Sequence, residues 1–301
     1  MTTGLYGTPP PDLAKPDPRA TQFSPLIPGA AAIEDAAPDS LEAMTMLAPP
    51  GTIERRYGLA QALRTLAPGG RLMALAPKDK GGTRLRKELE AFGCVVAETA
   101  KRHHRLCVCA RPAAPTGIEA AISAGAPRQS SELGLWTQPG VFSWDRVDPG
   151  SALLTQHLPA LAGAGADLGC GIGLLARPAL AQAAVQRLTL IDLDRRAVEA
   201  ARRNIDDPRA RFLWADVRAP DAALTGLDFV VMNPPFHDGG REDRALGQAF
   251  IARAAASLRK GGLCLLVANR HLPYEAAMAP LFAKVALKVE AGGYKVYEAR
   301  K

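Results

Sequence analysis

The stretch Leu227–Gly239 brings together residue types that could hold a primary amine for chemistry. It reads Leu-Asp-Phe-Val-Val-Met-Asn-Pro-Pro-Phe-His-Asp-Gly. The amide oxygen of Asn233 and the backbone carbonyl of Pro234 can both accept hydrogen bonds from an exocyclic NH2 group, while Phe236 can stack on the attached ring. Such an amine would present its nitrogen lone pair to an incoming electrophile. Asn-Pro and Pro-Pro are also ordinary turn formers, so this stretch alone leaves a plain loop open.

The residues before this corner predict a strand that positions it. The run from Asp228 to Met232 is short, apolar and β-branched, and the prolines Pro234 and Pro235 cannot continue a ladder. Asn233–Phe236 should therefore lie just past the carboxyl end of a strand. Open α/β sheets bind their ligands at that edge.

A second motif, Asp167-Leu168-Gly169-Cys170-Gly171-Ile172-Gly173, lies between a predicted strand and a predicted helix. A tight glycine-rich turn there lets a ligand approach the backbone and the helix N-terminus. A dinucleotide fold requires Gly-x-Gly-x-x-Gly, but Leu174 occupies the position of its last glycine. The motif instead resembles the S-adenosylmethionine loop of class I methyltransferases. In that family the acid, here Asp167, holds the cationic amino-acid end, and the glycines admit the methionine and ribose portions.

Two further acids follow predicted strands. Asp192 closes Leu188–Ile191 and is placed to accept the two ribose hydroxyls, while Asp216 follows Phe212–Ala215 and is placed to take the adenine amino group. Each acid alone could be a solvated turn or a helix cap. Three acids at the ends of successive strands favour a cofactor site.

Strand and helix patterns alternate from Trp136 onward, which predicts an α/β domain with a mostly parallel, Rossmann-like sheet covered by helices on both faces. Pro178 should kink or delay the first helix after the glycine motif. The last two strands, joined by Gly292-Gly293, predict an antiparallel hairpin at the sheet edge. We expect this catalytic domain to span residues 136–301.

The rest of the chain divides into three parts. Residues 1–38 contain eight prolines without periodicity and predict a flexible arm. Residues 39–111 predict a smaller α/β domain, and residues 112–135 a linker. Pro68–Ala76 resembles Lys260–Ala268, and Met44–Pro50 resembles Val230–Pro235 with Ala48 in the place of Asn233. The first domain therefore resembles a truncated duplicate of the second domain's C-terminal half, and it should be catalytically silent.

Composition limits the class of protein and its partners. The 301 residues are 48% hydrophobic, which is enough for a core, and they carry a net charge of +7. Between Arg55 and Arg111 stand thirteen Lys and Arg against four acids, a net charge of +9 that suits RNA or a solvated helix face. No apolar run is long enough to span a membrane, and the first residues lack a signal peptide, so we expect a cytoplasmic protein. The five scattered cysteines predict neither a structural metal nor a disulfide framework.

Four motifs together closely resemble the small-subunit ribosomal RNA guanine-N2 methyltransferases, in which a degenerate methyltransferase domain precedes an active one. They are Pro139-Gly-Val-Phe-Ser143, the glycine motif, Asn233–Gly239 and Gly293-Tyr-Lys-Val-Tyr297. The related large-subunit enzymes share much of this pattern. The resemblance is strong over residues 136–301, weak over 40–111 and absent before residue 39.

This resemblance implies transfer of the S-adenosylmethionine methyl group to a guanine N2 in ribosomal RNA, within the small subunit or its precursor. We separately expect a monomer that uses no metal. Asn233 and Pro234 would orient the amine and Phe236 would hold the base, with Asn233 also beside the cofactor. His237 and the neighbouring Asp238 are expected to shape the pocket, and the first domain, through Arg84, Arg86 and Lys87 among others, to hold RNA.

Three alternatives remain from the residues alone. The same corner could serve an adenine-N6 methyltransferase or a protein glutamine methyltransferase, although the glutamine enzymes usually carry Tyr where Phe236 stands. A non-catalytic RNA-binding protein is disfavoured because Asn233 and the glycines are intact. Binding of S-adenosylmethionine would separate this last class from the enzymes.

Overall fold

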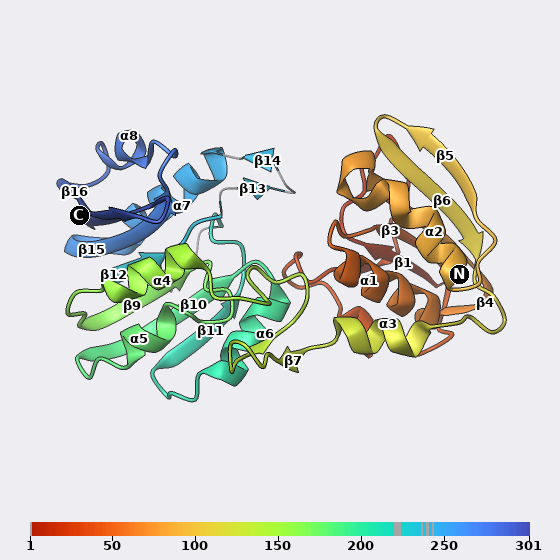
Figure 1. Ribbon diagram of the computed structural model, residues 1–301, viewed down its shortest axis with the longest axis horizontal. Coiled ribbons are helices and arrows are strands. Elements are labelled where there is room, and N and C mark those ends of the chain that lie inside the picture. The colour runs from red at the N-terminus through yellow and green to blue at the C-terminus, as the bar shows by residue number, and fades with distance from the viewer. Residues whose placement is uncertain (1, 220–223, 236, 239–240, 243) are drawn as a thin grey trace. The chain divides into compact units, whose positions relative to one another are not determined.

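The computed structural model divides into two compact units, residues 1–126 and 127–301. It describes residues 2–219, 224–235, 237–238, 241–242 and 244–301. Figure 1 colours the first unit red to yellow-green and the second unit yellow-green to blue. Each unit contains its own sheet and its own hydrophobic core.

The second unit is built on a seven-stranded sheet in the order β11-β10-β9-β12-β15-β17-β16. Five strands run parallel, and β17 and β16 are antiparallel to their neighbours, as the Gly292-Gly293 turn predicts. The strands are β9 (Gly163–Leu168), β10 (Val185–Asp192), β11 (Ala210–Trp214), β12 (Leu227–Met232), β15 (Leu258–Asn269), β16 (Lys284–Ala291) and β17 (Tyr294–Arg300). Two short pairs complete the described strands: β7 (Arg128–Gln129) with β8 (Trp136–Thr137), and β13 (His237–Asp238) with β14 (Arg241–Glu242).

Helices cover both faces of this sheet (Figure 1). They are α4 (Pro149–Gln156), α5 (Ala176–Leu180), α6 (Arg195–Asn204), α7 (Arg244–Ser257) and α8 (Tyr274–Met278). Along β12, Phe229 and Val231 pack with α4, α5 and α6, whereas Val230 and Met232 pack with α7 and α8. This alternation follows from the two-residue period of a strand. It leaves both faces of the central strands buried, which accounts for their unbroken apolar sequences.

The first unit contains a six-stranded sheet in the order β2-β1-β3-β4-β6-β5. Its strands are β1 (Thr3–Tyr6), β2 (Thr21–Phe23), β3 (Leu41–Leu47), β4 (Leu66–Pro77), β5 (Ala97–Lys101) and β6 (His104–Ala110). Its helices are α1 (Thr52–Thr65), α2 (Thr83–Ala91) and α3 (Ile118–Gly125), with short turns η1 (Ile33–Asp35) and η2 (Lys78–Gly82). Strands β1 to β4 are parallel, and β6 and β5 are antiparallel to their neighbours.

The two sheets have the same topology, strand for strand. The order β2-β1-β3-β4-β6-β5 repeats as β10-β9-β12-β15-β17-β16, and only β11 has no counterpart. The details agree as well: Gly69 and Gly70 exchange backbone hydrogen bonds with Arg111, as Gly261 and Gly262 do with Lys301. The duplication predicted for the C-terminal half therefore extends over nearly the whole sheet.

Two expectations differ from the structure, and one on helix α5 agrees with it. The proline-rich residues 1–38 are not a flexible arm, because β1 and β2 hydrogen-bond into the sheet and Tyr6, Phe23 and Ile33 are buried in its core. Tertiary pairing thus orders a segment without local periodicity. Residues 112–126 are not linker, because α3 packs on α1. Helix α5, Ala176–Leu180, begins so that Pro178 falls in its first turn, where proline is tolerated, in agreement with the predicted delay.

Candidate active site

Asn233 follows the last residue of β12, at the carboxyl edge of the sheet, as predicted. Its side-chain Nδ2 donates to Asp148 Oδ2 at 2.8 Å and to Ser151 Oγ at 2.9 Å. Asp148 and Ser151 are 7% and 6% exposed. Because both acceptors bind the nitrogen, the Asn233 carbonyl oxygen is the end of the amide that remains to accept a hydrogen bond from a ligand.

A pocket joins this corner to the glycine motif. Its lining includes Asn233, Ser151 and the exposed ring of Phe142, together with the loop Gly169–Ile172, Leu174 and Leu175. The structure thus brings together two motifs that lie 60 residues apart in the chain. Parallel strands β9 and β12 are direct neighbours, which places their carboxyl ends at one edge.

The glycines of the motif allow a conformation that other residues rarely adopt. Gly169, Gly171 and Gly173 have φ values of 74°, 53° and 91°. A Cβ on Gly173 would lie 2.8 Å from Ile205 Cδ1, whereas a Cβ on Gly171 would meet nothing within 4 Å. Gly173 therefore serves packing against α6, while the backbone at Gly171 is open to a ligand.

Asp167 is a buried acid that no described residue satisfies. Its carboxylate is fully buried, and neither oxygen makes a hydrogen bond of good geometry with a described residue, although the Ala176 N–H faces it and opposes the rise of its pKa. Burial, and then the charge of Asp192, raises the pKa of Asp167 to about 8. An unpaired buried carboxylate is costly, and a cationic ligand group would relieve that cost. This chemistry fits the ammonium group of an amino acid.

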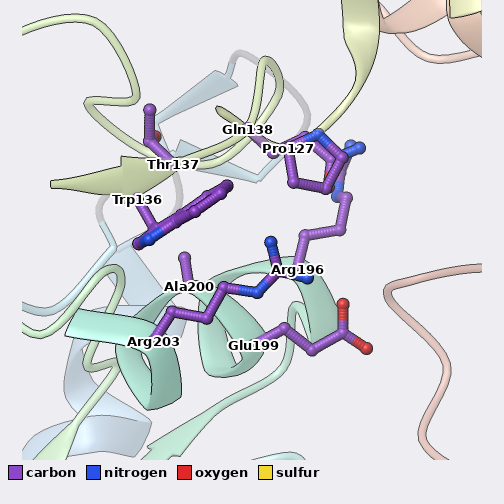
Figure 2. A pocket seen from close by; sticks show the side chains of 8 residues that line it. All are labelled: Pro127, Trp136, Thr137, Gln138, Arg196, Glu199, Ala200 and Arg203. Atoms are coloured by element: carbon purple, nitrogen blue, oxygen red, sulfur yellow. The ribbon is translucent and has the colours of Figure 1, made fainter. Parts of the chain in front are cut away.

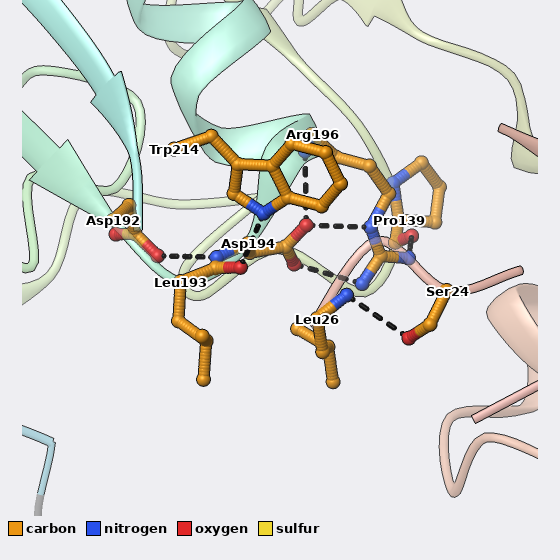
Figure 3. Close-up of polar contacts among 8 residues, drawn as sticks. All are labelled: Ser24, Leu26, Pro139, Asp192, Leu193, Asp194, Arg196 and Trp214. Atoms are coloured by element: carbon orange, nitrogen blue, oxygen red, sulfur yellow. Dashed lines mark hydrogen bonds and ion pairs between the residues drawn. The ribbon is translucent and has the colours of Figure 1, made fainter. Parts of the chain in front are cut away.

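Asp192 ends β10 and holds the glycine loop. One carboxylate oxygen accepts from the Gly171 N–H at 2.8 Å, and the other accepts from the Asp194 N–H at 2.9 Å (Figure 3). Burial raises the pKa of Asp192 to about 6, and these backbone donors oppose that rise. Each carboxylate oxygen can accept a further hydrogen bond, so the two backbone bonds leave capacity for a diol.

Asp216 lies two residues beyond β11, and its carboxylate is paired with Arg218. Arg218 donates to both of its oxygens, with Nη2 to Oδ2 at 2.7 Å. This side-chain hydrogen bonding holds the pKa of Asp216 below its usual value. An adenine amino group would have to share the carboxylate with Arg218.

Comparisons with known proteins place the chain in a family. The model of the methyltransferase small domain matches residues 132–298. Ribosomal RNA small subunit methyltransferase C of Pseudomonas paraeruginosa is 33% identical over 287 residues, covering 93% of this chain and 86% of that protein. The chain belongs to the ribosomal RNA small subunit methyltransferase C family. The protein of that name from Shewanella loihica is 31% identical, over 87% of this chain and 78% of its own length.

A solved structure extends the family relationship over both units. The T. thermophilus 16S rRNA N2 G1207 methyltransferase, in complex with AdoMet and guanosine, superposes with a TM-score of 0.81 at 26% identity. The match covers 100% of this chain and 88% of that one. The predicted class I methyltransferase fold and the S-adenosylmethionine-dependent methyltransferase activity are therefore confirmed.

The corner beyond Pro235 is described only in part. Phe236 lies outside the described residues. His237 and Asp238 form strand β13, which pairs with Arg241–Glu242, and the structure describes only their backbone. Among the described residues, no cluster of His, Cys, Asp or Glu could hold a metal, and no helix is long and apolar enough to cross a membrane.

Some cations of the first unit's basic segment already bind groups within the protein. Arg55 is fully buried and pairs with Glu88, with Nη2 to Oε1 at 2.6 Å. Arg64 donates to three backbone carbonyls. The three residues predicted to hold RNA, Arg84, Arg86 and Lys87, are all exposed on α2. Arg86 also forms an ion pair with Glu90 at 2.8 Å.

The first unit lacks the chemical groups of the second. Matching the strands by their pairing register places apolar or hydroxyl side chains at the three key positions. These are Leu5 for Asp167, Ser24 for Asp192 and Leu47 for Asn233. Leu47, rather than Ala48, is thus the structural counterpart of Asn233. The strand pairing determines which residues are equivalent, whereas aligning the two Pro-Pro motifs shifts the match by one residue.

A buried arginine of the first unit also occupies the corner that follows β3. Arg55 Nη1 donates to the carbonyl of Pro50 at 2.7 Å and to that of Pro49 at 3.3 Å. In the second unit two prolines also follow the end of the matching strand, just after Asn233. In the first unit the Arg55 guanidinium occupies this proline corner.

A second, smaller pocket lies beside α6 (Figure 2). Trp136, Gln138 and Arg196 line it, and the Arg203 guanidinium lies 4.7 Å from the Trp136 ring centroid. Arg196 is itself buried and pairs with Asp194 at 2.8 Å, while it also reaches the Pro139 carbonyl at 3.5 Å (Figure 3). These contacts join the loop that carries Phe142 to the start of α6.

Sequence reasoning missed Asp148 and Ser151. A local signal was present, because Asp148 precedes Pro149 at the first helical position, an ordinary helix start. The structure shows that Asp148 caps α4 by accepting from the Ser151 N–H at 2.7 Å. Nothing in the local sequence indicates that the same carboxylate also reaches Asn233, 85 residues away.

Proposed function

We propose that this enzyme methylates the exocyclic N2 of a guanine in small-subunit ribosomal RNA. The observation that carries the proposal is the Asn233 amide, whose nitrogen is occupied by Asp148 and Ser151 so that its oxygen is left as an acceptor beside the glycine-loop pocket. An acceptor is what an amine requires. The name of the T. thermophilus enzyme, which specifies 16S rRNA and N2 of a G, supports the base, and the names of the other relatives support small-subunit ribosomal RNA.

The residues of the second unit divide the work of binding and orientation. Asp167 would hold the cationic end of the cofactor, Gly171 would admit it to the backbone, and Asp192 would bind the ribose hydroxyls. S-Adenosylmethionine supplies an electrophilic methyl group when bound. Asp216 would take the adenine amino group in competition with Arg218.

Catalysis then depends on positioning rather than on a strong base. The Asn233 oxygen and the Pro234 carbonyl would accept hydrogen bonds from the two amine N–H groups, which aims the nitrogen lone pair toward the methyl group, and the methylated amine would then lose one proton to water. Phe236 would hold the base, with Pro235 keeping the corner rigid and His237 shaping the pocket. A guanine in structured RNA has to leave its stack to enter such a site.

The first unit is proposed to hold RNA through exposed cations such as Arg84 and Lys87 on α2. The substrate would be the small ribosomal subunit or its precursor in the cytoplasm, and the active species a monomer. Phosphate contacts of this kind position a substrate without specifying its sequence.

The proposal is tested by methyl transfer from labelled S-adenosylmethionine to small subunits that lack the modification, followed by digestion to nucleosides. Label in N2-methylguanosine is the expected result. Label in N6-methyladenosine, or in glutamine of a ribosomal protein, would replace the proposal with one of the alternatives.

A further inference from the structure

Asn233 could in principle be held in either of two orientations. A side-chain amide has an oxygen and an NH2 group of nearly the same shape, and only hydrogen bonds distinguish them. If the amide were reversed, its NH2 group would face the NH2 group of the substrate, donor against donor. Something in the site has to exclude that orientation.

Asp148 is the group that can exclude it. An ionised carboxylate accepts hydrogen bonds and cannot donate them, whereas the Ser151 hydroxyl can do either. Ser151 alone would therefore tolerate both orientations of Asn233. The 2.8 Å contact from Nδ2 to Asp148 Oδ2 is compatible with one orientation only.

Asp148 is itself rigidly placed. Its Oδ2 also accepts the Ser151 N–H at the start of α4, and Pro149 fixes the first turn of that helix. The next residue, Gly150, packs against the Tyr294 ring so closely that a Cβ would lie 2.8 Å from Cε1. Because Asp148 and Ser151 are both buried, water is a poor substitute for either.

We propose that Asp148 is a positioning residue for amine methylation, which acts by holding the Asn233 amide with its oxygen toward the substrate. This role rests on the function proposed above. A negative charge behind the amide also polarises it, which strengthens the oxygen as an acceptor. We name the Asp148 carboxylate and the Ser151 hydroxyl together the amide clamp.

The first variant to test is Asp148→Asn. Asparagine has the same shape, but Asp148 Oδ2 accepts both the Ser151 N–H and the Asn233 Nδ2, so an asparagine that turns its NH2 group toward Asn233 and permits the reversed amide gives up the bond to the Ser151 N–H. We expect kcat to fall about 10- to 100-fold and the melting temperature to fall modestly with the weakened cap, with the Kd for S-adenosylmethionine little changed. Asp145→Asn, an exposed substitution of the same kind three residues earlier, is the matched control and should leave kcat unchanged.

Two double variants separate positioning from a merely structural role. Adding Asp148→Asn to Asn233→Ala should slow the enzyme no further, because the clamp then has nothing to orient. Combining Asp148→Asn with Asn233→Asp exchanges donor and acceptor across the contact. The kcat of this double variant should be about tenfold or more above that of Asn233→Asp alone, in which two carboxylates repel each other.

The readout is total methyl transfer to ribosomal RNA, with the methylated nucleoside identified separately. Methyl on adenine N6 would overturn the proposed base but leave the predicted pattern of rates intact, since that substrate is also an amine. Wild-type kcat in Asp148→Asn, additive losses with Asn233→Ala, or no recovery in the exchanged pair would each overturn the role of Asp148.

Discussion

At the scale of single residues, the site depends on what each polar atom can still bind. Asn233 has its nitrogen occupied and its oxygen available, Asp192 retains capacity after two backbone bonds, and Asp167 makes no hydrogen bond of good geometry with a described residue. These differences predict separate effects on chemistry, cofactor binding and stability.

Asn233→Ala should abolish most turnover and leave cofactor binding intact. The missing oxygen acts on the substrate amine, not on the fold or on the glycine loop. Calorimetry with S-adenosylmethionine and single-turnover rates on small subunits would measure the two effects separately. An unchanged rate together with tight cofactor binding would remove Asn233 from the mechanism.

Asp192→Ala should chiefly weaken cofactor binding, by roughly 1 to 3 kcal/mol for the removal of a charge-assisted hydrogen bond. Part of this effect would come from the loop itself, because the Gly171 N–H would no longer have its acceptor. An unchanged dissociation constant would place the ribose elsewhere.

Asp167 predicts a pH-dependent stability in the cofactor-free protein. Its pKa is about 8 in the fold and about 3.8 when unperturbed. Between those values the folded protein keeps a proton that the unfolded chain releases, so the free energy of unfolding decreases as pH rises from about 4 to about 8. Below that window both states are protonated and the penalty is absent; above it the full penalty applies.

Urea unfolding at pH 5 and pH 8 measures this effect. Asp167→Asn keeps the shape without the charge, so it should gain stability relative to wild type as pH rises, by on the order of 2 kcal/mol or more between the two values. Because Asp192 has a pKa of about 6, the free energy of unfolding of the variant should still depend on pH, but less strongly than that of the wild type. Parallel stability profiles of the two proteins would show that Asp167 does not titrate in this range.

At the scale of elements, the sequence predicts best where a local pattern and a tertiary role agree. β12 ends at Met232, directly before Asn233, and the hairpin of β16 and β17 turns at Gly292-Gly293, as their patterns predict. β1 and β2 could not be predicted, because four-residue and three-residue strands among prolines carry no periodicity of their own. The capping of α4 was readable, but its hydrogen bond to the residue after β12 depends on the assembled sheet.

Helix α2 provides a test of the first unit's proposed role. Reversing the charge of Arg84, Arg86 and Lys87 together should raise the RNA concentration needed for half-maximal rate. The salt dependence should flatten, by about 0.7 to 0.9 in slope for each phosphate that the helix no longer neutralises. Affinity for S-adenosylmethionine should not change.

A matched variant separates RNA binding from helix stability in this test. Arg84→Ala with Lys87→Ala leaves the Arg86–Glu90 pair intact, so it should show a smaller shift in the same direction. Wild-type methylation by the triple variant at every salt concentration would mean that α2 is only a solvated surface.

At the scale of the whole molecule, one sheet topology occurs twice with different chemistry. The second unit retains three polar residues at strand ends, and the first has leucine or serine at the same register positions. Arg55 fills the first unit's proline corner. Motif comparison detected the repeat but misplaced Asn233's counterpart by one residue, because only the paired strands fix the register.

The most direct test of the central claim is mass mapping of 16S ribosomal RNA from cells that lack this protein, with wild-type and Asn233→Ala genes restored separately. We predict that one guanine loses its N2-methyl group in the deletion strain. The wild-type gene should restore it and the Asn233→Ala gene should not. An unchanged map in the deletion strain, or full restoration by Asn233→Ala, would contradict the account.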